Sequence, residues 1–241
     1  MTTPHAPATT ITTIAFDGDD TLWHNESIFS MTQERYRTLM RKYCAEEELD
    51  GQLLATEGRN LRLFGYGVKG FMLSMIETAI EVSDRQVSAA DIQTIVDFGK
   101  AMLDHPVELL DGVRETVDAL RERYRLLVIT KGDLFDQESK LARSGLAELF
   151  WTVEIVSEKD EGTYRRILDA QDVEPGEFLM VGNSIRSDIL PVVGIGASAV
   201  YVPYHLTWAH ERAELGETPN GRFWTVRRID ELPGLLRRIA A

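Results

Sequence analysis

Short apolar runs alternate with stretches of helical periodicity from Val107 to the end of the chain, and this alternation constrains the fold more than any other feature of the sequence. The apolar runs are nearly continuous and too short for helices, which is typical of parallel strands that are buried on both faces. The sequence therefore predicts an α/β protein with a doubly wound parallel sheet. Strands are expected at residues 126–129, 152–156, 178–181, 198–202 and 223–226, and helices at 112–123, 133–143, 162–170, 187–193 and from Asp230 onward.

One more strand is expected before this region, at residues 11–16, and it ends in Asp17-Gly18-Asp19-Asp20. Three carboxylates at the end of a buried strand repel one another and lose hydration unless positive charge lies among them. A hard divalent cation meets this need, and Mg²⁺ fits because it binds through few carboxylates and retains water. A solvated acidic turn is the alternative, but the chain returns at once to apolar residues at 21–23. An EF-hand loop is excluded because its glycine and closing glutamate are not at the required spacing.

Residues 24–106 have helical periodicity and predict an all-helical insertion after the first strand. Ser27 and Ser88 are expected to cap the first and last helices of this insertion. We therefore expect an α/β domain from residues 11–23 and 107–241 and a helical domain from residues 24–106. Within the insertion, the sequence predicts a solvated acidic run at 46–48, helices at 53–64, 71–82 and 88–103, and a glycine-containing turn at 65–70.

Charge and cysteine content exclude several classes of partner. The net charge of −13 argues against nucleic acid and anionic membranes. The single cysteine, Cys44, cannot form an intramolecular disulfide, which suits a reducing compartment. No apolar run is long enough to span a membrane, and residues 1–10 lack a signal-peptide pattern and are expected to form a flexible tail. We therefore expect a cytoplasmic protein, and the sequence leaves its oligomeric state open.

Candidate functional residues follow the predicted strands at their carboxyl ends, where doubly wound sheets bind ligands. They are Asp17 with Asp19, then Thr130, Lys159, and finally Asn183 with Asp188. Taken singly, Thr130 could be a helix cap, Lys159 a surface charge and Asp188 a favourable charge at a helix N-terminus. Their occurrence at successive strand ends of one sheet favours a shared site.

Together these groups predict a phosphoryl-transfer site. Asp17 is expected to be the nucleophile, and Asp19 the acid that protonates the leaving oxygen and then the base that activates water. Thr130 and the following backbone N–H groups would hold phosphate oxygens, and Lys159 would neutralise phosphoryl charge. Mg²⁺ is expected to be held by Asp17, the main-chain carbonyl of Asp19, and the loop that contains Asn183 and Asp188.

The first of these segments, residues 16–22, resembles the Asp-x-Asp-x-Thr motif of the haloacid dehalogenase-like hydrolase superfamily, whose members are mostly Mg²⁺-dependent phosphatases. Thr130 is similar to the second motif of this superfamily, Lys159 to the third, and residues 182–188 to the fourth. The resemblance covers nearly the whole chain. It implies that residues 24–106 form a helical cap that selects the substrate and moves on hinges near 23–26 and 106–110.

Two features qualify the resemblance. Asn183 stands where these phosphatases usually have an aspartate metal ligand, which implies a weaker Mg²⁺ site in which Asp188 carries more of the charge. In contrast, true haloacid dehalogenases lack an acidic residue at the position of Asp19. Its presence here favours phosphate chemistry. The expected substrate is a small phosphorylated metabolite. A phosphomutase, a 2-haloacid dehalogenase-type hydrolase and a non-catalytic regulator with the same fold remain the alternatives.

The sequence leaves the substrate contacts open. Lys69, in the turn at 65–70, could meet an anionic group of the substrate, or it could be an exposed lysine of a connecting turn. Lys131 has the same ambiguity. Residues 205–222, which include Trp208, are polar and irregular, and an exposed Trp208 could belong to an interface or to the edge of a lid.

Overall fold

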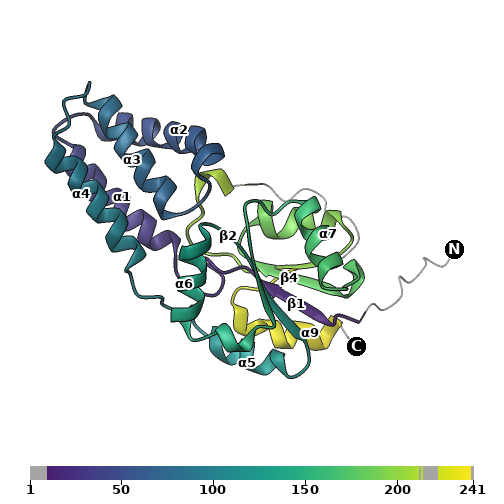
Figure 1. Cartoon of the computed structure of the whole chain (residues 1–241). Coiled ribbons are helices and arrows are strands. Elements are labelled where there is room, and N and C mark those ends of the chain that lie inside the picture. The colour runs from purple at the N-terminus through teal and green to yellow at the C-terminus, as the bar shows by residue number, and fades with distance from the viewer. Residues whose placement is uncertain (1–9, 212, 214–221, 240–241) are drawn as a thin grey trace.

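The computed structural model describes residues 10–211, 213 and 222–239. The predicted N-terminal tail, apart from Thr10, and much of the irregular segment after Trp208 lie outside the described residues. Figure 1 shows a helical lobe built from the early part of the chain beside a larger lobe that contains the sheet. None of the helices in the described ranges has the length and apolar composition of a membrane span.

The sheet is parallel throughout and has the strand order β3-β2-β1-β4-β5-β6. The first strand therefore lies in the centre, and Phe16 at its end pairs with Val128 on one side and Val181 on the other. The strand order reverses at β1, which makes this edge the topological switch point where doubly wound sheets bind ligands. The strands are β1 (Thr13–Phe16), β2 (Arg125–Lys131), β3 (Thr152–Val156), β4 (Phe178–Gly182), β5 (Ser198–Tyr201) and β6 (Phe223–Thr225).

Helices cover both faces of this sheet, so the predicted doubly wound fold is confirmed. Along β1, Ile14 and Phe16 contribute to one apolar cluster and Ala15 to another on the opposite face, as the alternation of side chains in a strand requires. The first cluster packs against α5 (Val113–Arg121), α6 (Leu134–Ser144) and α9 (Leu232–Ile239), and the second against α7 (Glu161–Ala170) and α8 (Leu190–Gly194).

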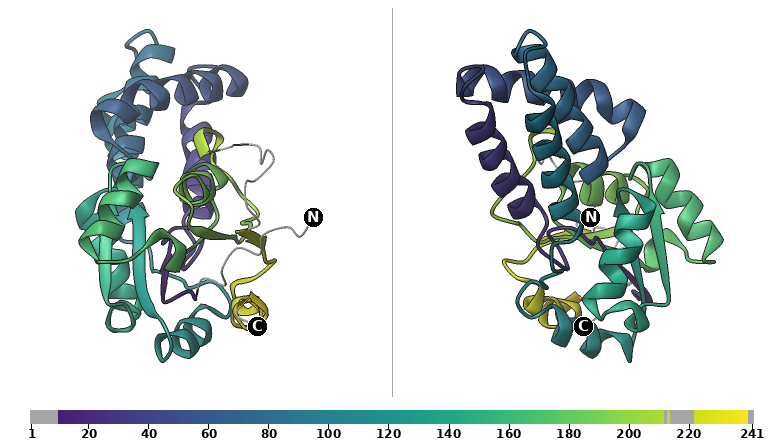
Figure 2. Two further views of the ribbon diagram at one scale, coloured as in Figure 1. Left: turned by 90° about the vertical axis from the view of Figure 1, so that its right-hand side faces the viewer. Right: turned by 60° about the vertical axis from the view of Figure 1, so that its left-hand side comes forward.

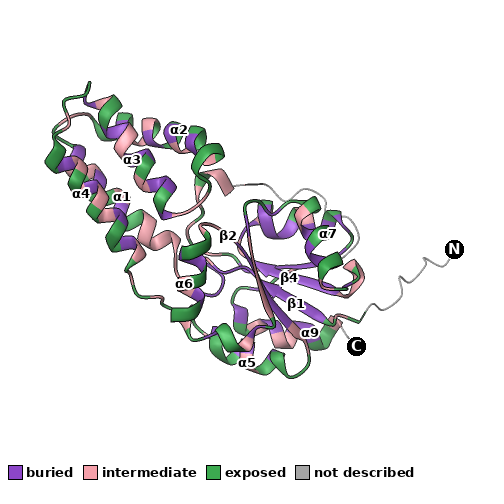
Figure 3. Cartoon of the chain, viewed as in Figure 1, coloured by how far each residue is buried: buried purple, intermediate pink, exposed green. Residues whose placement is uncertain are grey.

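The helical lobe has an apolar core of its own. Figure 2 shows its helices standing over the carboxyl edge of the sheet, and Figure 3 shows buried residues on the faces that they turn toward one another. Tyr36 and Met75 are fully buried there, and the Tyr36 hydroxyl donates to the carbonyl of Met75 at 2.8 Å. The helices of this lobe are α1 (Glu26–Met40), α2 (Glu46–Phe64), α3 (Val68–Val82) and α4 (Ala89–Leu103).

Several predicted helix starts were wrong. Ser27 lies inside α1, because the carboxylate of Asp20 caps this helix by accepting the backbone N–H groups of Asn25 (2.8 Å) and Glu26 (3.0 Å). The second helix begins at Glu46, so the exposed acidic run lies in its first turn, where the helix dipole favours negative charge. Ser88 caps α4 as predicted, accepting the backbone N–H of Asp91.

Two further boundaries differ. The third helix begins at Val68, which places Lys69 in its first turn and not in a loop. The predicted helix at 187–193 is a π-helical turn, Ile185–Ile189, followed by α8. The wider turn keeps the carboxylate of Asp188 inside the protein, fully buried beside Gly182.

The chain passes between the two lobes at two places, and these connections pair with each other. Trp23 and Leu109 form an antiparallel bridge. The backbone N–H of His24 donates to the carbonyl of Glu108 at 2.9 Å, and that of Leu110 donates to the carbonyl of Leu22 at 3.0 Å. Both connections coincide with the expected hinges, whose movement remains a prediction.

Candidate active site

A cavity of about 160 Å³ lies between the carboxyl edge of the sheet and the helical lobe. The sheet side contributes the ends of β1, β2 and β4, the helical side contributes α1, α2 and α3, and residues 206–211 close a third side. All six residues that the sequence singled out at the strand ends line this cavity: Asp17, Asp19, Thr130, Lys159, Asn183 and Asp188.

Asp17, Lys159 and Asp188 form a buried chain of charges. The Lys159 ammonium lies 2.5 Å from Oδ1 of Asp17 and 2.7 Å from Oδ1 of Asp188. Oδ2 of Asp188 accepts the backbone N–H of Ser184 at 2.9 Å, so both of its oxygens are engaged. A side chain at Gly182 would collide with this carboxylate, since a Cβ there would lie 2.2 Å from Oδ2. Glycine is therefore required at the end of β4.

Burial has the largest effect on the pKa values of Asp17 and Lys159. It raises the pKa of Asp17 to about 7, against the opposing attraction of Lys159. Burial also lowers the pKa of Lys159, but Asp17 and Asp188 outweigh this effect, and the net pKa is raised. Lys159 therefore stays protonated at neutral pH and provides a fixed positive charge beside the Asp17 carboxylate.

Asp19 is held by three nitrogen donors. Its Oδ1 accepts from the indole N–H of Trp23 at 2.7 Å and from Lys140 at 3.0 Å, and its Oδ2 accepts from the amide of Gln137 at 2.8 Å. Gln137 and Lys140 project from successive turns of α6. These donors fix the orientation of the carboxyl group.

Asn183 lies where oxygen ligands for a metal converge. Its side-chain amide is 3.0 Å from Oδ2 of Asp17 and 3.2 Å from the main-chain oxygen of Asp19. With its nitrogen turned toward them, the amide donates a hydrogen bond to each. With its oxygen turned toward them, three oxygens face one another, which is favourable only around a cation. Carboxylate, carbonyl and amide oxygens are hard ligands, so these residues fit Mg²⁺.

Two observations bear on the charge of such a metal site. Over the described residues, no group of three His, Cys, Asp or Glu side chains could hold a metal ion by itself. The Asp188 carboxylate contacts Lys159 and the Ser184 N–H, so its role as a metal ligand stays a prediction. The donor set that converges here has a single carboxylate, that of Asp17.

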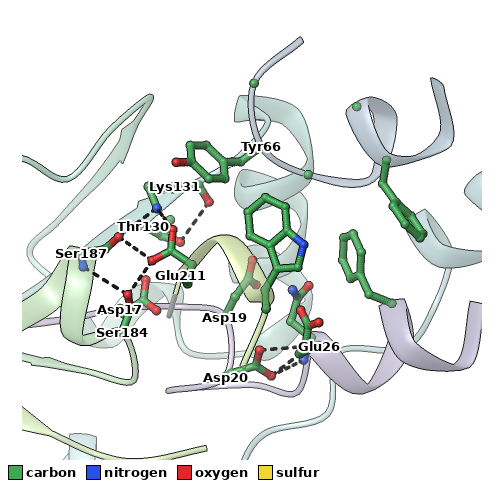
Figure 4. A pocket seen from close by; sticks show the side chains of 18 of the residues that line it. Asp17, Asp19, Asp20, Glu26, Tyr66, Thr130, Lys131, Ser184, Ser187 and Glu211 are labelled. Atoms are coloured by element: carbon green, nitrogen blue, oxygen red, sulfur yellow. Dashed lines mark hydrogen bonds and ion pairs between the residues drawn. The ribbon is translucent and has the colours of Figure 1, made fainter. Parts of the chain in front are cut away.

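Thr130 is 2% exposed at the end of β2 and lines the cavity next to Lys131. The Lys131 ammonium contacts Glu211, lies 2.9 Å from the Ser187 hydroxyl, and stands 4.0 Å from the centroid of the Tyr66 ring. The Glu211 carboxylate also accepts from the hydroxyls of Ser184 (2.5 Å) and Ser187 (2.7 Å). Figure 4 shows this carboxylate pointing into the group formed by Lys131, Ser184 and Ser187.

Of the two roles left open for Lys69, the structure supports the exposed lysine, whereas Trp208 is less exposed than expected. Lys69 is exposed, is not among the residues that line the cavity, and forms an ion pair of 2.9 Å with Asp133 at the start of α6. Trp208 is partly buried and not exposed, because its ring packs edge-on against Tyr66, with 5.9 Å between centroids. It also donates a hydrogen bond to Glu57. Lys69 therefore bridges the two lobes, and Trp208 forms part of the cavity wall.

Sequence reasoning missed the residues that reach the cavity from outside the strand ends. Gln137 and Lys140 carry a weak signal, since their spacing puts both on the helix face that follows Thr130. Glu211 comes from an irregular segment and had no such signal, whereas Trp208, in the same segment, was noted as the possible edge of a lid. The helical lobe adds Glu26, Phe29, Glu57, Asn60, Leu61, Phe71 and Ser74.

The family model for haloacid dehalogenase-like hydrolases matches residues 11–194, which include every strand-end residue of the cavity. The chain belongs to this family. It is a haloacid dehalogenase-like hydrolase, and thus an enzyme.

Curated relatives of this hydrolase are named as a phosphatase and a nucleotidase. Over 144 residues it is 28% identical to mouse N-acylneuraminate-9-phosphatase, with 57% of this chain and 55% of the relative aligned. The match thus spans about half the length of that relative. Over 235 residues it is 26% identical to the pyrimidine 5'-nucleotidase YjjG of Escherichia coli, which covers 92% of this chain and 96% of the relative.

Solved structures share the whole fold of this hydrolase. A haloacid dehalogenase-like family hydrolase from Xanthomonas campestris superimposes with a TM-score of 0.86 and 41% identity, covering 98% of this chain and 95% of that one. The HAD-hydrolase YfnB from Bacillus subtilis, which was solved with bound magnesium, has a TM-score of 0.67 at 14% identity and covers 94% and 99% of the two chains. At that identity the second likeness shows the fold alone.

Proposed function

We propose that this hydrolase is a Mg²⁺-dependent phosphatase that cleaves a small phosphomonoester through an aspartyl-phosphate on Asp17. The observation that carries this proposal is the Asp17 carboxylate held 2.5 Å from a buried ammonium, with Asp19 lining the same cavity. The names of the mouse relative, a phosphatase, and the E. coli relative, a 5'-nucleotidase, support it.

In the first step, a carboxylate oxygen of Asp17 attacks the phosphorus atom and the bond from phosphorus to the ester oxygen breaks. Asp19, in its protonated form, gives its proton to the leaving oxygen, which departs as an alcohol. Lys159 neutralises negative charge that would otherwise oppose the approach of the phosphoryl group to Asp17. The Thr130 hydroxyl holds a phosphoryl oxygen at the end of β2.

In the second step, Asp19 is a carboxylate and removes a proton from water. The water oxygen attacks phosphorus, the bond to Asp17 breaks, and inorganic phosphate leaves. The three donors to Asp19 suit this step, since they orient the carboxylate as an acceptor. Asp19 is thus restored to its protonated form for the next cycle.

Asp17, the main-chain oxygen of Asp19 and Asn183 would hold Mg²⁺, with Asp188 supporting the site through its contacts with Lys159 and the Ser184 N–H. Bound Mg²⁺ supplies positive charge between an anionic nucleophile and an anionic substrate. Residues 24–106 act as a cap over the core of residues 11–23 and 107–241. A role for Asp19 in proton transfer favours phosphate-ester hydrolysis over dehalogenation, because an alkoxide leaving group needs a proton and a halide does not.

The proposal is tested by hydrolysis of p-nitrophenyl phosphate by the wild type and by the Asp17→Asn variant, each with Mg²⁺ and with EDTA. We expect activity only in the wild type with Mg²⁺, and its recovery when Mg²⁺ is restored after EDTA. Thermal unfolding of both proteins controls for loss of fold. Equal activity of a folded Asp17→Asn variant would reject Asp17 as the nucleophile, and activity in EDTA would reject the metal.

A further inference from the structure

The two sides of the cavity differ in the balance of their charges. On the core side, three lysines line the cavity, and each contacts at least one carboxylate: Lys159 contacts Asp17 and Asp188, Lys140 contacts Asp19, and Lys131 contacts Glu211. On the cap side, none of the described lining residues is basic. That side instead presents two carboxyl groups, those of Glu26 and Glu57, together with amide, hydroxyl and aromatic groups.

Glu26 and Glu57 are close enough to influence each other. Burial, followed by the negative charges of Asp20 and Glu57, raises the pKa of Glu26 to about 8. Burial raises the pKa of Glu57 to about 7, although the Trp208 hydrogen bond opposes this rise. Within the described part of the chain, neither carboxyl forms an ion pair with a lysine or arginine. The cap side therefore presents two acidic groups that no lysine or arginine of the described residues compensates.

A substrate places its phosphoryl group against Asp17 and Lys159 and its alcohol portion toward the cap. Resting on the proposed phosphatase function, we propose that Glu26 and Glu57 select phosphomonoesters whose alcohol portion is uncharged or carries an amino group, and exclude those with a second anionic group. A second anion would face two carboxyl groups in a poorly solvated cavity. The lysines that line the cavity offer no free partner for that anion, because Lys131 is paired with Glu211, Lys140 with Asp19, and Lys159 with Asp17 and Asp188.

Hydroxyl and amino groups meet suitable partners on the same wall. A carboxyl group near its pKa at neutral pH can donate to or accept from a hydroxyl, and it ionises when an ammonium group binds beside it. Phe29 and Phe71 line the same region and offer apolar faces to a carbon skeleton. The chemical class that fits is an amino sugar phosphate or a neutral sugar or polyol phosphate.

The test compares three phosphates with the same six-carbon skeleton: glucosamine 6-phosphate, glucose 6-phosphate and 6-phosphogluconate. Calorimetric binding to the Asp17→Asn protein with Mg²⁺ gives affinities that do not depend on turnover. We expect the amine to bind at least as tightly as the neutral sugar and about tenfold or more tighter than the carboxylate. For the wild type, kcat/KM for phosphate release should rank the three compounds in the same order as their affinities.

Two variants locate the discrimination. The Glu26→Gln/Glu57→Gln protein should lose most of the preference for the amine over the carboxylate, mainly through KM. Glu47→Gln is the matched control, because it makes the same change at an exposed position of α2 away from the cavity, and it should leave the preference intact. Equal binding of the three sugars, tighter binding of 6-phosphogluconate, no binding of any of them, or an unchanged order in the double variant would overturn the inference. If the three ligands bind in the expected order of affinity but the wild type releases no phosphate from them, the phosphatase function is rejected and the charge selectivity of the cavity stands.

Discussion

The core side and the cap side of the cavity treat charge in opposite ways. The core side surrounds Asp17, Asp19 and Asp188 with lysine ammonium groups at hydrogen-bonding distance. The cap side holds Glu26 and Glu57 half-buried, without an ion pair in the described residues, and raises the pKa of both. Compensated carboxylates are ready for chemistry, whereas uncompensated ones can sense the charge of a ligand. We therefore expect substitutions on the core side to change kcat, and those on the cap side to change selectivity and pH dependence.

The largest loss of turnover is expected for Asp19→Asn, a substitution that also separates the two chemical steps. p-Nitrophenolate leaves without a proton, so phosphoryl transfer to Asp17 continues, but the amide cannot remove a proton from water. Turnover should fall about 10²- to 10⁴-fold, and phosphorylated protein should accumulate. Intact-protein mass spectrometry after acid quench detects this species. If the folded Asp19→Asn variant shows a burst of p-nitrophenolate but no phosphorylated protein after the quench, an intermediate on Asp17 is contradicted.

A smaller effect on the same side is expected for Lys140→Met. The Lys140 ammonium fixes Asp19 and also donates to Oδ1 of Asn25 at 2.8 Å. Its loss should lower kcat about 10- to 100-fold with little change in KM, because Lys140 acts on the orientation of Asp19 and not on substrate affinity. Lys100→Met, at an exposed lysine of α4, is the control. A rise in KM at constant kcat would instead place Lys140 in substrate binding.

Asn183→Asp tests the metal side of the core. An added carboxylate beside Asp17 and the carbonyl of Asp19 should tighten Mg²⁺ binding roughly tenfold. Titration of activity with Mg²⁺ measures the half-saturating concentration in both proteins. An identical titration curve would show that this side chain is not a ligand.

The smallest effect is expected on the cap side, in stability. The pKa of Glu57 is 4.5 in its ordinary environment and about 7 in the folded protein, so the folded state binds more protons than the unfolded state between these values. Stability is therefore lost as pH rises from 4.5 through about 7. Glu57→Gln should raise the free energy of unfolding by about 1 kcal/mol at about pH 8, a figure reduced for partial solvent exposure, with no gain near pH 4.5.

Urea denaturation of the wild type, Glu57→Gln and the exposed Glu47→Gln at the two pH values measures this difference. A gain of equal size at both pH values would mean that packing, and not the buried charge of Glu57, is responsible.

The core side of the cavity could be predicted from the sequence, and the cap side could not. The parallel sheet brings the ends of β1, β2 and β4 to one edge, so the grouping of Asp17, Thr130 and Asn183 follows from strand order alone. The placement of Asp20 was not predictable, because a helix cap from a residue outside the helix depends on the path of the loop. Glu57 reaches the cavity through packing of the cap on the core, and such long-range geometry has no local signal.

The pairing of the two connections has a consequence for how this architecture tolerates rearrangement. The backbone N–H of Leu110 donates to the carbonyl of Leu22, so the chain leaves the α/β domain and returns to it at the same place. Exchange of residues 25–106 for a short turn would thus leave the strand order and both apolar clusters of the sheet in place. The helical lobe is thus attached to the α/β domain at a single point, so its side chains can be changed without altering the strand ends that carry Asp17 and Thr130.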